Sequence, residues 1–217
     1  NTIIHIMTSM RFQICLFDDH IFQTQMPYAM CRPSFTVPVG SSPLFDKVAA
    51  VWPDYPVSVI CHSNHVHYIN EHYPKTPVNT LNKSLPTLFI NGRLYANRNK
   101  LTSIESALKP DKNHVFVHKN DVLAIFCNTE ANELVFKALT NSNPLSDILS
   151  ILSQSTIKET MPDACIFHHW WDYIQHLSFT LTSDFSDQNQ GNTIEGQLAN
   201  TTVLINEYTI AIDKHAT

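Results

Sequence analysis

Glycine is scarce in this sequence, which has only four among 217 residues, where about 7% would be ordinary. Loops that cradle phosphate through backbone N–H groups usually need glycine, so a Gly-rich phosphate loop is not expected. Long apolar runs are also missing, because none approaches the roughly 18–20 residues of a membrane-spanning helix. The sequence therefore predicts no membrane partner.

Basic charge and paired cysteines are lacking as well. The net charge of −5 and the pI near 6.2 argue against a nucleic-acid partner, which usually meets a basic face. The five cysteines are scattered without a C-x-x-C pair, so neither a disulfide framework nor a zinc site is indicated. Residues 1–9 lack the pattern of a signal peptide. We therefore expect a cytoplasmic protein with reduced thiols, whose folded part begins near Met10.

Short apolar runs rich in β-branched residues predict buried strands. They are residues 11–17, 56–63, 86–96 with a break at Asn91-Gly92, and a hairpin over 114–127. Helical spacing of apolar residues or helix-start signals predict helices in 43–52, 131–140 and 142–155. Strands that alternate with helices indicate an α/β fold of Rossmann-like type with a mostly parallel sheet.

The first strand is followed by two acids, Asp18 and Asp19, and then by the pair Arg32-Pro33. In open α/β sheets ligands bind beyond the carboxyl ends of the strands, which is where these residues are expected. The acids can hold a divalent metal or orient a ribose, but aspartate after a strand is also a common helix cap. An arginine fixed by the following proline can grip phosphate.

Two further segments are rich in histidine or aromatic residues. The histidines His62, His65, His67 and His72 lie close together, with His65 and His67 on one face of a predicted strand, but they lack metal-site spacing. The segment FHHWWDYIQH places Trp170, Trp171, Ile174 and Leu177 within helical reach of one another. This pattern favours a packing face over a cofactor site.

The character of the sequence changes near residue 187. Residues 187–217 are polar and turn-like at first and then hold short β-type triplets with apolar residues such as Val203, Ile205, Ile210 and Ile212. This spacing fits the opening coil of a β-solenoid, which needs neighbouring coils to bury its apolar face. We therefore expect one domain over residues 10–186, followed by a linker and a first solenoid coil over 187–217.

Eight short motifs follow one another along the chain. They are, in order, Phe17-Asp18-Asp19, Met26-Pro27, Arg32-Pro33, Gly40, Phe89-Ile90-Asn91-Gly92, Trp171-Asp172, Asp184-Phe185 and Ile194-Glu195-Gly196. With these motifs the chain resembles sugar nucleotidyltransferase-like proteins similar to the bacterial bifunctional N-acetylglucosamine-1-phosphate uridylyltransferase/glucosamine-1-phosphate acetyltransferase. Their order and spacing, rather than any single motif, carry the resemblance over nearly the whole chain.

The resemblance implies a nucleotidyltransferase domain followed by a left-handed β-helix, with a nucleoside triphosphate and a sugar-1-phosphate as substrates and Mg²⁺ as cofactor. It also implies a possible homotrimer formed through the β-helix. The expected catalytic residues are Arg32 and Asp18, and the expected substrate-binding residues are Asp19, Asn91, Gly92 and Arg93. The expected metal ligands are Asp18, Asp172 and Asp184.

Two departures from the family pattern favour an alternative function. The first loop has two acids and no glycine, and Arg93 stands where a metal-binding aspartate is expected. Pro38 also replaces a frequent arginine. The alternative to a transferase in nucleotide-sugar synthesis is therefore a non-catalytic nucleotide-sugar-binding or scaffolding domain attached to a β-helix acyltransferase.

Overall fold

The computed structural model describes residues 11–152, 156–188, 194–199, 201–203, 210 and 212. A six-stranded sheet forms its centre, in the order β4-β1-β5-β8-β7-β9. The strands are β1 (Gln13–Phe17), β4 (Val57–Ile60), β5 (Thr87–Asn91), β7 (His114–His118), β8 (Asp121–Cys127) and β9 (Ile157–Thr160). β1 pairs in parallel with both β4 and β5, and β9 pairs in parallel with β7, while β8 is antiparallel to its two neighbours. The predicted α/β fold with a mostly parallel sheet is confirmed.

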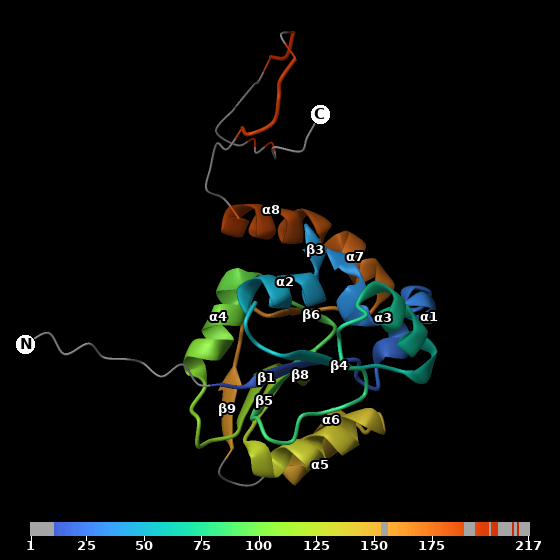
Figure 1. The fold of residues 1–217 in the computed structure, drawn as a ribbon, viewed down its shortest axis with the longest axis vertical. Helices are drawn as coiled ribbons and strands as arrows, with labels where there is room; N and C mark the ends of the chain where they lie inside the picture. The colour runs from blue at the N-terminus through green and yellow to red at the C-terminus, as the bar shows by residue number, and fades with distance from the viewer. Residues whose placement is uncertain are drawn as a thin grey trace, which may run out of the picture.

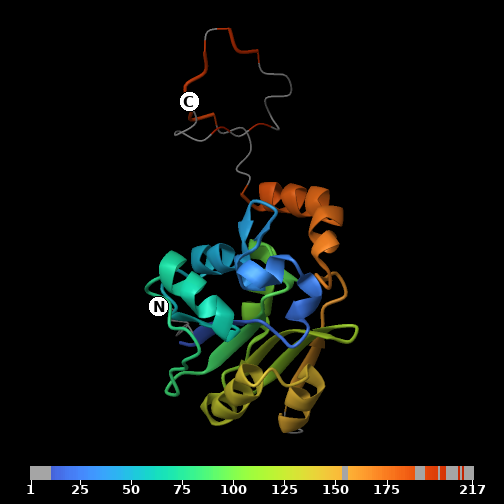
Figure 2. The ribbon, with the colours of Figure 1, turned by 90° about the vertical axis from the view of Figure 1, so that its right-hand side faces the viewer.

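Helices cover both faces of the sheet (Figures 1 and 2). On one side lie α2 (Leu44–Val51), α3 (Val66–His72) and α4 (Arg98–Ala107), and on the other lie α5 (Thr129–Thr140) and α6 (Leu145–Ile151). Successive residues of β1 point to opposite faces, so that Ile14 and Leu16 join the first core layer and Cys15 and Phe17 the second. Two apolar layers therefore fix the register of the central strand.

Shorter elements build the rim above the sheet. The segment after β1 holds the 3-10 helix η1 (Phe22–Gln25), the short helix α1 (Tyr28–Cys31) and the 3-10 helix η2 (Ser34–Thr36). A hairpin, β2 (Pro38–Val39) and β3 (Ser42–Pro43), leads into α2, and β6 (Leu94–Tyr95) pairs with β10 (Cys165–Ile166). The chain then forms α7 (Trp170–Gln175) and α8 (Leu177–Gln188), which lie along the hairpin side of the domain (Figure 1). α8 thus extends past the domain boundary predicted at residue 186.

Several sequence predictions can be compared directly with these elements. The strands, the 114–127 hairpin and the three helices occur where the patterns placed them. The prediction that His65 and His67 share a strand is wrong, because His65 ends the 3-10 helix η3 (Ser63–His65) and His67 lies in α3. No helix in the described part of the chain is both long and apolar enough to cross a bilayer.

The predicted solenoid coil falls largely outside the described residues. Within those that are described, Ile194 and Ile212 form an isolated parallel bridge, and the backbone N–H of Glu195 donates to the carbonyl of Ile212 at 2.9 Å.

Candidate functional site

The carboxyl edge of the sheet gathers most of the predicted site residues. The chain leaves β1 for β4 on one side and returns to β5 on the other, so β1 and β5 flank the point where strand order reverses. Crevices at such switch points are the usual ligand sites of open α/β sheets. Asp18 and Asp19 follow β1, Gly92 and Arg93 follow β5, and Asp121 begins the neighbouring antiparallel strand β8.

A buried ion pair occupies the centre of this edge. The Arg93 Nη2 atom lies 2.6 Å from Asp19 Oδ2, and both side chains are 0% exposed. Arg93 Nε donates to both oxygens of Asp19, and the Asn91 amide donates to Asp19 Oδ2 at 2.9 Å. The backbone N–H of Ile21 donates to the remaining side of the carboxylate. The Asp19 carboxylate is therefore surrounded by donors from its own chain.

Arg93 is equally well satisfied on its outer side. Its Nη1 atom donates to the carbonyl of Phe167 at 2.9 Å, and Nη2 lies 3.5 Å from Asp121 Oδ1. The backbone N–H of Phe167 donates in return to the carbonyl of Arg93. Asp19, Asn91 and Arg93 lie in an internal network that ties β1, β5 and the 165–168 segment together, and substrate binding by these three residues stays a prediction. Their contacts are those of a structural ion pair.

Gly92 completes this network through its lack of a side chain. Its N–H donates to the carbonyl of Phe17 at 2.7 Å. A Cβ atom here would lie 3.0 Å from the Phe35 ring and 3.1 Å from that carbonyl oxygen. The glycine of the Asn91-Gly92 pair thus permits close packing at the switch point. Its predicted contact with substrate stays a prediction.

Asp18 differs from its neighbour in having one carboxylate oxygen without a hydrogen bond. Its Oδ1 accepts from the backbone N–H of Ser34 at 3.0 Å. Its Oδ2 is buried, makes no hydrogen bond, and lies 3.7 Å from Nδ1 of the buried His65. Burying a carboxylate oxygen without a partner costs free energy, so a structure that keeps one usually uses it.

Asp18 also lines a cavity of ≈ 390 Å³ at the carboxyl ends of β1 and β4, the Asp18 pocket. The other lining residues are Ile60, Cys61, His62, Ser63, Asn79, Leu139, Thr140, Asn141 and Ser142. Asn79 holds the end of β4 in place, because its side chain both accepts from Cys61 N–H and donates to the Cys61 carbonyl. Burial, together with the nearby Asp18, raises the pKa of the Cys61 thiol to about 12. Cys61 is therefore a neutral wall residue and not a thiolate nucleophile.

A second cavity, of ≈ 450 Å³, opens on the β7–β8 side of the same edge, and we name it the histidine pocket. It is lined by His118, Lys119, Asp121, Ala164, Cys165, Ile166, His168, His176 and Phe179. Asp121 Oδ2 lies 3.1 Å from His168 Nε2, while its Oδ1 faces Arg93. With its only carboxylate engaged in this way, the pocket presents a lysine and three histidines, which suits an anionic ligand.

Arg32 does not lie in either wall. It is half-buried, and its guanidinium sits 5.4 Å from the centre of the Tyr68 ring of α3, a cation–π arrangement. Arg32 thus lines neither of these two cavities, and phosphate contact by Arg32 stays a prediction.

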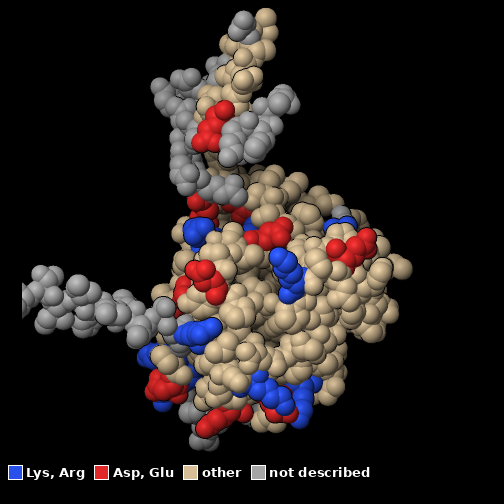
Figure 3. Space-filling view, viewed as in Figure 1, with Lys and Arg blue, Asp and Glu red and all other residues tan. Residues whose placement is uncertain are grey.

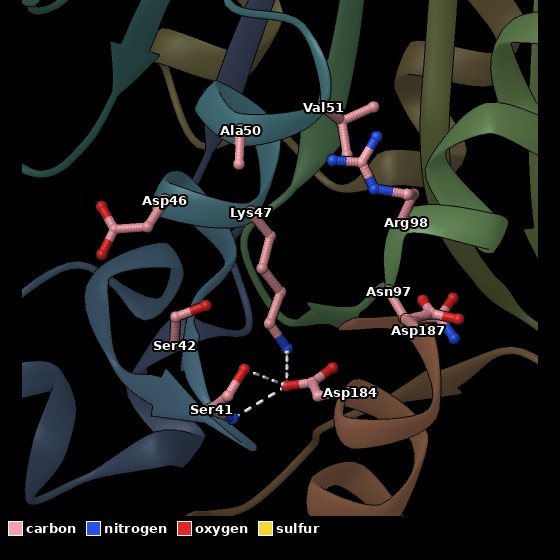
Figure 4. Close-up of a pocket in the computed structure, with 10 residues that line it drawn as sticks. All are labelled: Ser41, Ser42, Asp46, Lys47, Ala50, Val51, Asn97, Arg98, Asp184 and Asp187. Atoms are coloured by element: carbon pink, nitrogen blue, oxygen red, sulfur yellow. Dashed lines mark hydrogen bonds and ion pairs between the residues drawn. The ribbon is translucent and has the colours of Figure 1, made fainter. Parts of the chain in front are cut away.

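Asp184 lies in a third cavity, of ≈ 520 Å³, between the hairpin, α2, α4 and α8 (Figure 4). Lys47 Nζ lies 2.7 Å from Asp184 Oδ2, which also accepts from the N–H and hydroxyl of Ser41, while Tyr95 donates to Oδ1. Burial alone would raise the pKa of Asp184, but these donors outweigh it and hold that pKa below its usual value. Burial lowers the pKa of Lys47, and Asp184 opposes this by favouring the charged ammonium.

The metal set predicted from the resemblance is not assembled. Asp172 accepts from the backbone N–H groups of His168 and His169 at 2.7 and 2.8 Å, and so caps α7. Asp184 ties α8 to the hairpin. Among the residues that the structure describes, no three His, Cys, Asp or Glu side chains converge to hold a metal. Of the three, Asp18 has a buried oxygen, Oδ2, without a hydrogen bond.

Comparison with known proteins now identifies the family. The model of a family described as sugar nucleotidyl transferase matches residues 14–193, which is most of the chain. The chain belongs to this sugar nucleotidyl transferase family. No curated protein matches it.

Solved structures share the family's fold at low identity. A protein from Bacillus anthracis, assigned as a glucose-1-phosphate thymidylyltransferase, is 10% identical with a TM-score of 0.51, over 83% of this chain and 97% of its own. The 2-C-methyl-D-erythritol 4-phosphate cytidylyltransferase from Thermus thermophilus is 10% identical with a TM-score of 0.50, over 78% and 98%. The Rv0371c homologue from Mycobacterium sp. strain JC1 is 8% identical with a TM-score of 0.53, over 78% and 97%. At such identities the likeness establishes the fold of the nucleotidyl transferase domain.

Most residues that line the Asp18 pocket and the histidine pocket were not predicted from the sequence. The residues of the histidine pocket come from the β7–β8 turn and from the 164–179 segment, which no local pattern joins. Lys47 was also missed, although it follows the Gly40 turn on the first turn of a predicted helix. Asp184 was predicted as a metal ligand, and its ion pair with Lys47 was not.

Proposed function

We propose that this protein transfers a nucleotidyl group from a nucleoside triphosphate to a sugar-1-phosphate. Membership of the sugar nucleotidyl transferase family supports the reaction class. The observation that carries the proposal is the Oδ2 atom of Asp18, a buried carboxylate oxygen that makes no hydrogen bond and stands at the switch point of the sheet. An acid with an oxygen that lacks a hydrogen bond, beside polar walls, suits the phosphate end of a nucleotide bound with a cation.

The two pockets of the carboxyl edge suggest how the substrates divide. We assign the nucleotide to the Asp18 pocket, whose amide and hydroxyl groups at Asn79, Asn141, Ser63 and Ser142 suit a base and a ribose. We assign the sugar phosphate to the histidine pocket, because Lys119 and the imidazoles can face its anion. The Asp19–Arg93–Asp121 network lies between them and holds the two walls in a fixed relation.

In this reaction an oxygen of the sugar phosphate attacks the α-phosphorus of the triphosphate. The bond between the α-phosphorus and its bridging oxygen breaks, and pyrophosphate leaves. Catalysis of such transfers rests on positioning and on stabilising charge at the transferring phosphoryl group. Mg²⁺ commonly takes one or two protein carboxylates plus substrate phosphates. Asp18 Oδ2 would be one such ligand, and a Mg²⁺ ion held there with the substrate phosphates would neutralise part of their charge.

The proposal is tested by pyrophosphate release from the full chain, with a panel of nucleoside triphosphates, sugar-1-phosphates and Mg²⁺. We expect one pair to release pyrophosphate and Asp18→Asn to lower the rate at least about 10-fold. The amide oxygen of the variant can still accept from Ser34 N–H, so folding should be unaffected.

Asp54→Asn is the matched control, because Asp54 is exposed on a loop outside both pockets. It should keep the wild-type rate. Equal rates for wild type and Asp18→Asn would remove Asp18 from the site, even if the chain is an active transferase.

One observation favours the second candidate, a non-catalytic nucleotide-sugar-binding domain. Arg93 occupies the end of β5 and forms a buried ion pair with Asp19. Asp18 by itself offers a metal ion fewer carboxylate ligands than a pair of acids would. Nucleotide binding by calorimetry without pyrophosphate release from any substrate pair would support this candidate over the transferase.

A further inference from the structure

The wall of the histidine pocket contains one exposed aromatic ring among its polar groups. Phe179 of α8 lines this pocket and is 54% exposed. Its ring packs against the Tyr95 ring, with centroids 5.8 Å apart and the two planes at 68°. The Tyr95 hydroxyl donates to the carbonyl of Thr180, the next residue of α8, at 3.1 Å. These contacts hold the Phe179 ring in position and leave much of its surface open.

Two polar groups of the same wall are already engaged with each other. Asp121 lies 3.1 Å from His168 and 3.5 Å from Arg93. Arg93 Nη1 lies 3.4 Å from His168 Nδ1. A guanidinium nitrogen can only donate, so this ring nitrogen accepts and Nε2 carries the hydrogen toward Asp121. Asp121 and His168 therefore stabilise the wall, and contact with a ligand is left to the other side chains of the pocket.

His118 offers an acceptor to such a ligand. Its Nδ1 donates to the carbonyl of Met161 at 2.9 Å, because a carbonyl oxygen can only accept. In the neutral ring, Nε2 on the other side is then an acceptor. A hydroxyl group can donate to this atom, whereas an ionised phosphate oxygen has no hydrogen to give. His118 therefore suits a sugar hydroxyl.

Lys119 has a backbone conformation that lysine seldom adopts. It is the first residue of the two-residue turn between β7 and β8, and its φ is +52°. Glycine or asparagine usually fills such a position. The other described non-glycine residues with positive φ are Asn79 and Ser142, and both line the Asp18 pocket. Strained backbone of this kind gathers at ligand sites, so the turn supports a binding role for Lys119.

We infer that Phe179 is the platform on which the sugar ring of the phosphate substrate lies. This inference rests on the proposed assignment of the sugar phosphate to the histidine pocket. A pyranose ring has apolar faces formed by its C–H groups and a rim of hydroxyl groups. With one face on the Phe179 ring, its hydroxyls are left for His118 and its phosphate for Lys119. The ligand class is therefore a pyranosyl phosphate rather than an acyclic phosphate.

The overall charge of the protein gives an anionic ligand little help. The net charge is −5, and on the face shown in Figure 3 Lys and Arg side chains are interspersed with Asp and Glu, without a large basic patch. Long-range attraction therefore does not draw a phosphate to this protein. An ion pair with one exposed lysine contributes little by itself. Contact of the sugar ring with Phe179 should therefore supply much of the affinity.

Isothermal titration calorimetry of the full chain tests the ring contact. The probes are glucose-1-phosphate, mannose-1-phosphate and N-acetylglucosamine-1-phosphate, with glycerol-1-phosphate as the acyclic phosphate. Each is titrated alone and with Mg²⁺ and non-hydrolysable nucleoside triphosphate analogues. The wild type should bind at least one sugar phosphate about 10-fold more tightly than glycerol-1-phosphate, and Phe179→Ala should remove most of this preference. Phe185→Ala is the matched control and should keep it, because Phe185 is exposed on the same helix outside the pocket.

Lys119→Asn tests the phosphate contact separately from folding. Asparagine tolerates a positive φ better than lysine does, so the variant should melt at or above the temperature of the wild type. Its affinity for every phosphate probe should fall about 10-fold, because the ammonium group is lost. A purely structural role for Lys119 would leave the affinity unchanged at this stability.

Saturation-transfer NMR locates the sugar ring without any turnover. Irradiation of aromatic protons should saturate the ring C–H protons of the sugar in the wild type and in Phe185→Ala, but not in Phe179→Ala. Equal affinity for sugar phosphates and glycerol-1-phosphate, no binding of any sugar phosphate, or unchanged saturation in Phe179→Ala would overturn the inference. A chain that binds the sugar through Phe179 but releases no pyrophosphate would keep the inference and refute the transferase. Pyrophosphate release with an unchanged KM in Phe179→Ala would do the reverse.

Discussion

Replacing Arg93 with alanine separates the two roles that this residue can have. The structure predicts a loss of stability, because the Asp19 carboxylate, at 0% exposure, would be left buried without its cation. Removing one partner of a buried ion pair costs about 3–5 kcal/mol. At about 2–4 °C per kcal/mol for a domain of 150–250 residues, the melting temperature should fall by about 10 °C.

The loss should follow from the stranded charge rather than from lost packing alone. Asp19→Asn added to Arg93→Ala leaves a neutral amide in place of the carboxylate, and should restore about 1 kcal/mol or more. Arg98→Ala serves as the control, since Arg98 is exposed on α4 and its loss should change stability by less than about 0.5 kcal/mol. Urea unfolding followed by circular dichroism measures all three variants.

A different outcome would refute this reasoning. If Arg93→Ala melts within about 2 °C of the wild type and loses nucleotide binding, Arg93 contacts substrate and the ion pair contributes little.

Two further predictions concern the docking of α8. Asp184 has a lowered pKa, so its contribution to stability is present above the unfolded-state pKa and is lost as the pH falls through the folded-state value. Asp184→Asn should therefore flatten the decline in unfolding free energy below about pH 5 that the wild type shows in urea titrations; an unchanged acid limb would contradict this. Gly40→Ala should lower stability by about 1–3 kcal/mol, because Gly40 has φ +73° and a Cβ there would lie 2.3 Å from Asp184 Oδ2. A thermal melt equal to the wild type would show that the turn relaxes freely.

The fold was predictable where local pattern and burial agree. The runs ending at Phe17 and Ile60 are short, β-branched and apolar, and both became central strands. The helix with Leu145 and Ile148 on one face was equally clear. The 62–72 segment was misread because its histidines and β-branched residues suit a strand in isolation, whereas Ile69 packs into the core as part of α3.

The site was predictable in position but less so in its roles. Residues at the ends of parallel strands must share one edge, which is why Asp18, Asp19 and Arg93 were expected there. Their pairing was hidden, because Asp19 and Arg93 are 74 positions apart in sequence and only the packing of β1 against β5 joins them. The same holds for Asp121 and His168, which meet through the β6–β10 pair. One acid of Asp18-Asp19 thus became structural, and the sequence alone does not say which.

A structure of the protein with Mg²⁺ and a non-hydrolysable nucleoside triphosphate analogue is the most direct test of the nucleotide site. We expect the triphosphate at Oδ2 of Asp18, directly or through the metal ion, with the nucleoside against Asn79 and Asn141. A nucleotide bound in the histidine pocket, or in the cavity beside Asp184 with Asp18 untouched, would contradict the proposed site.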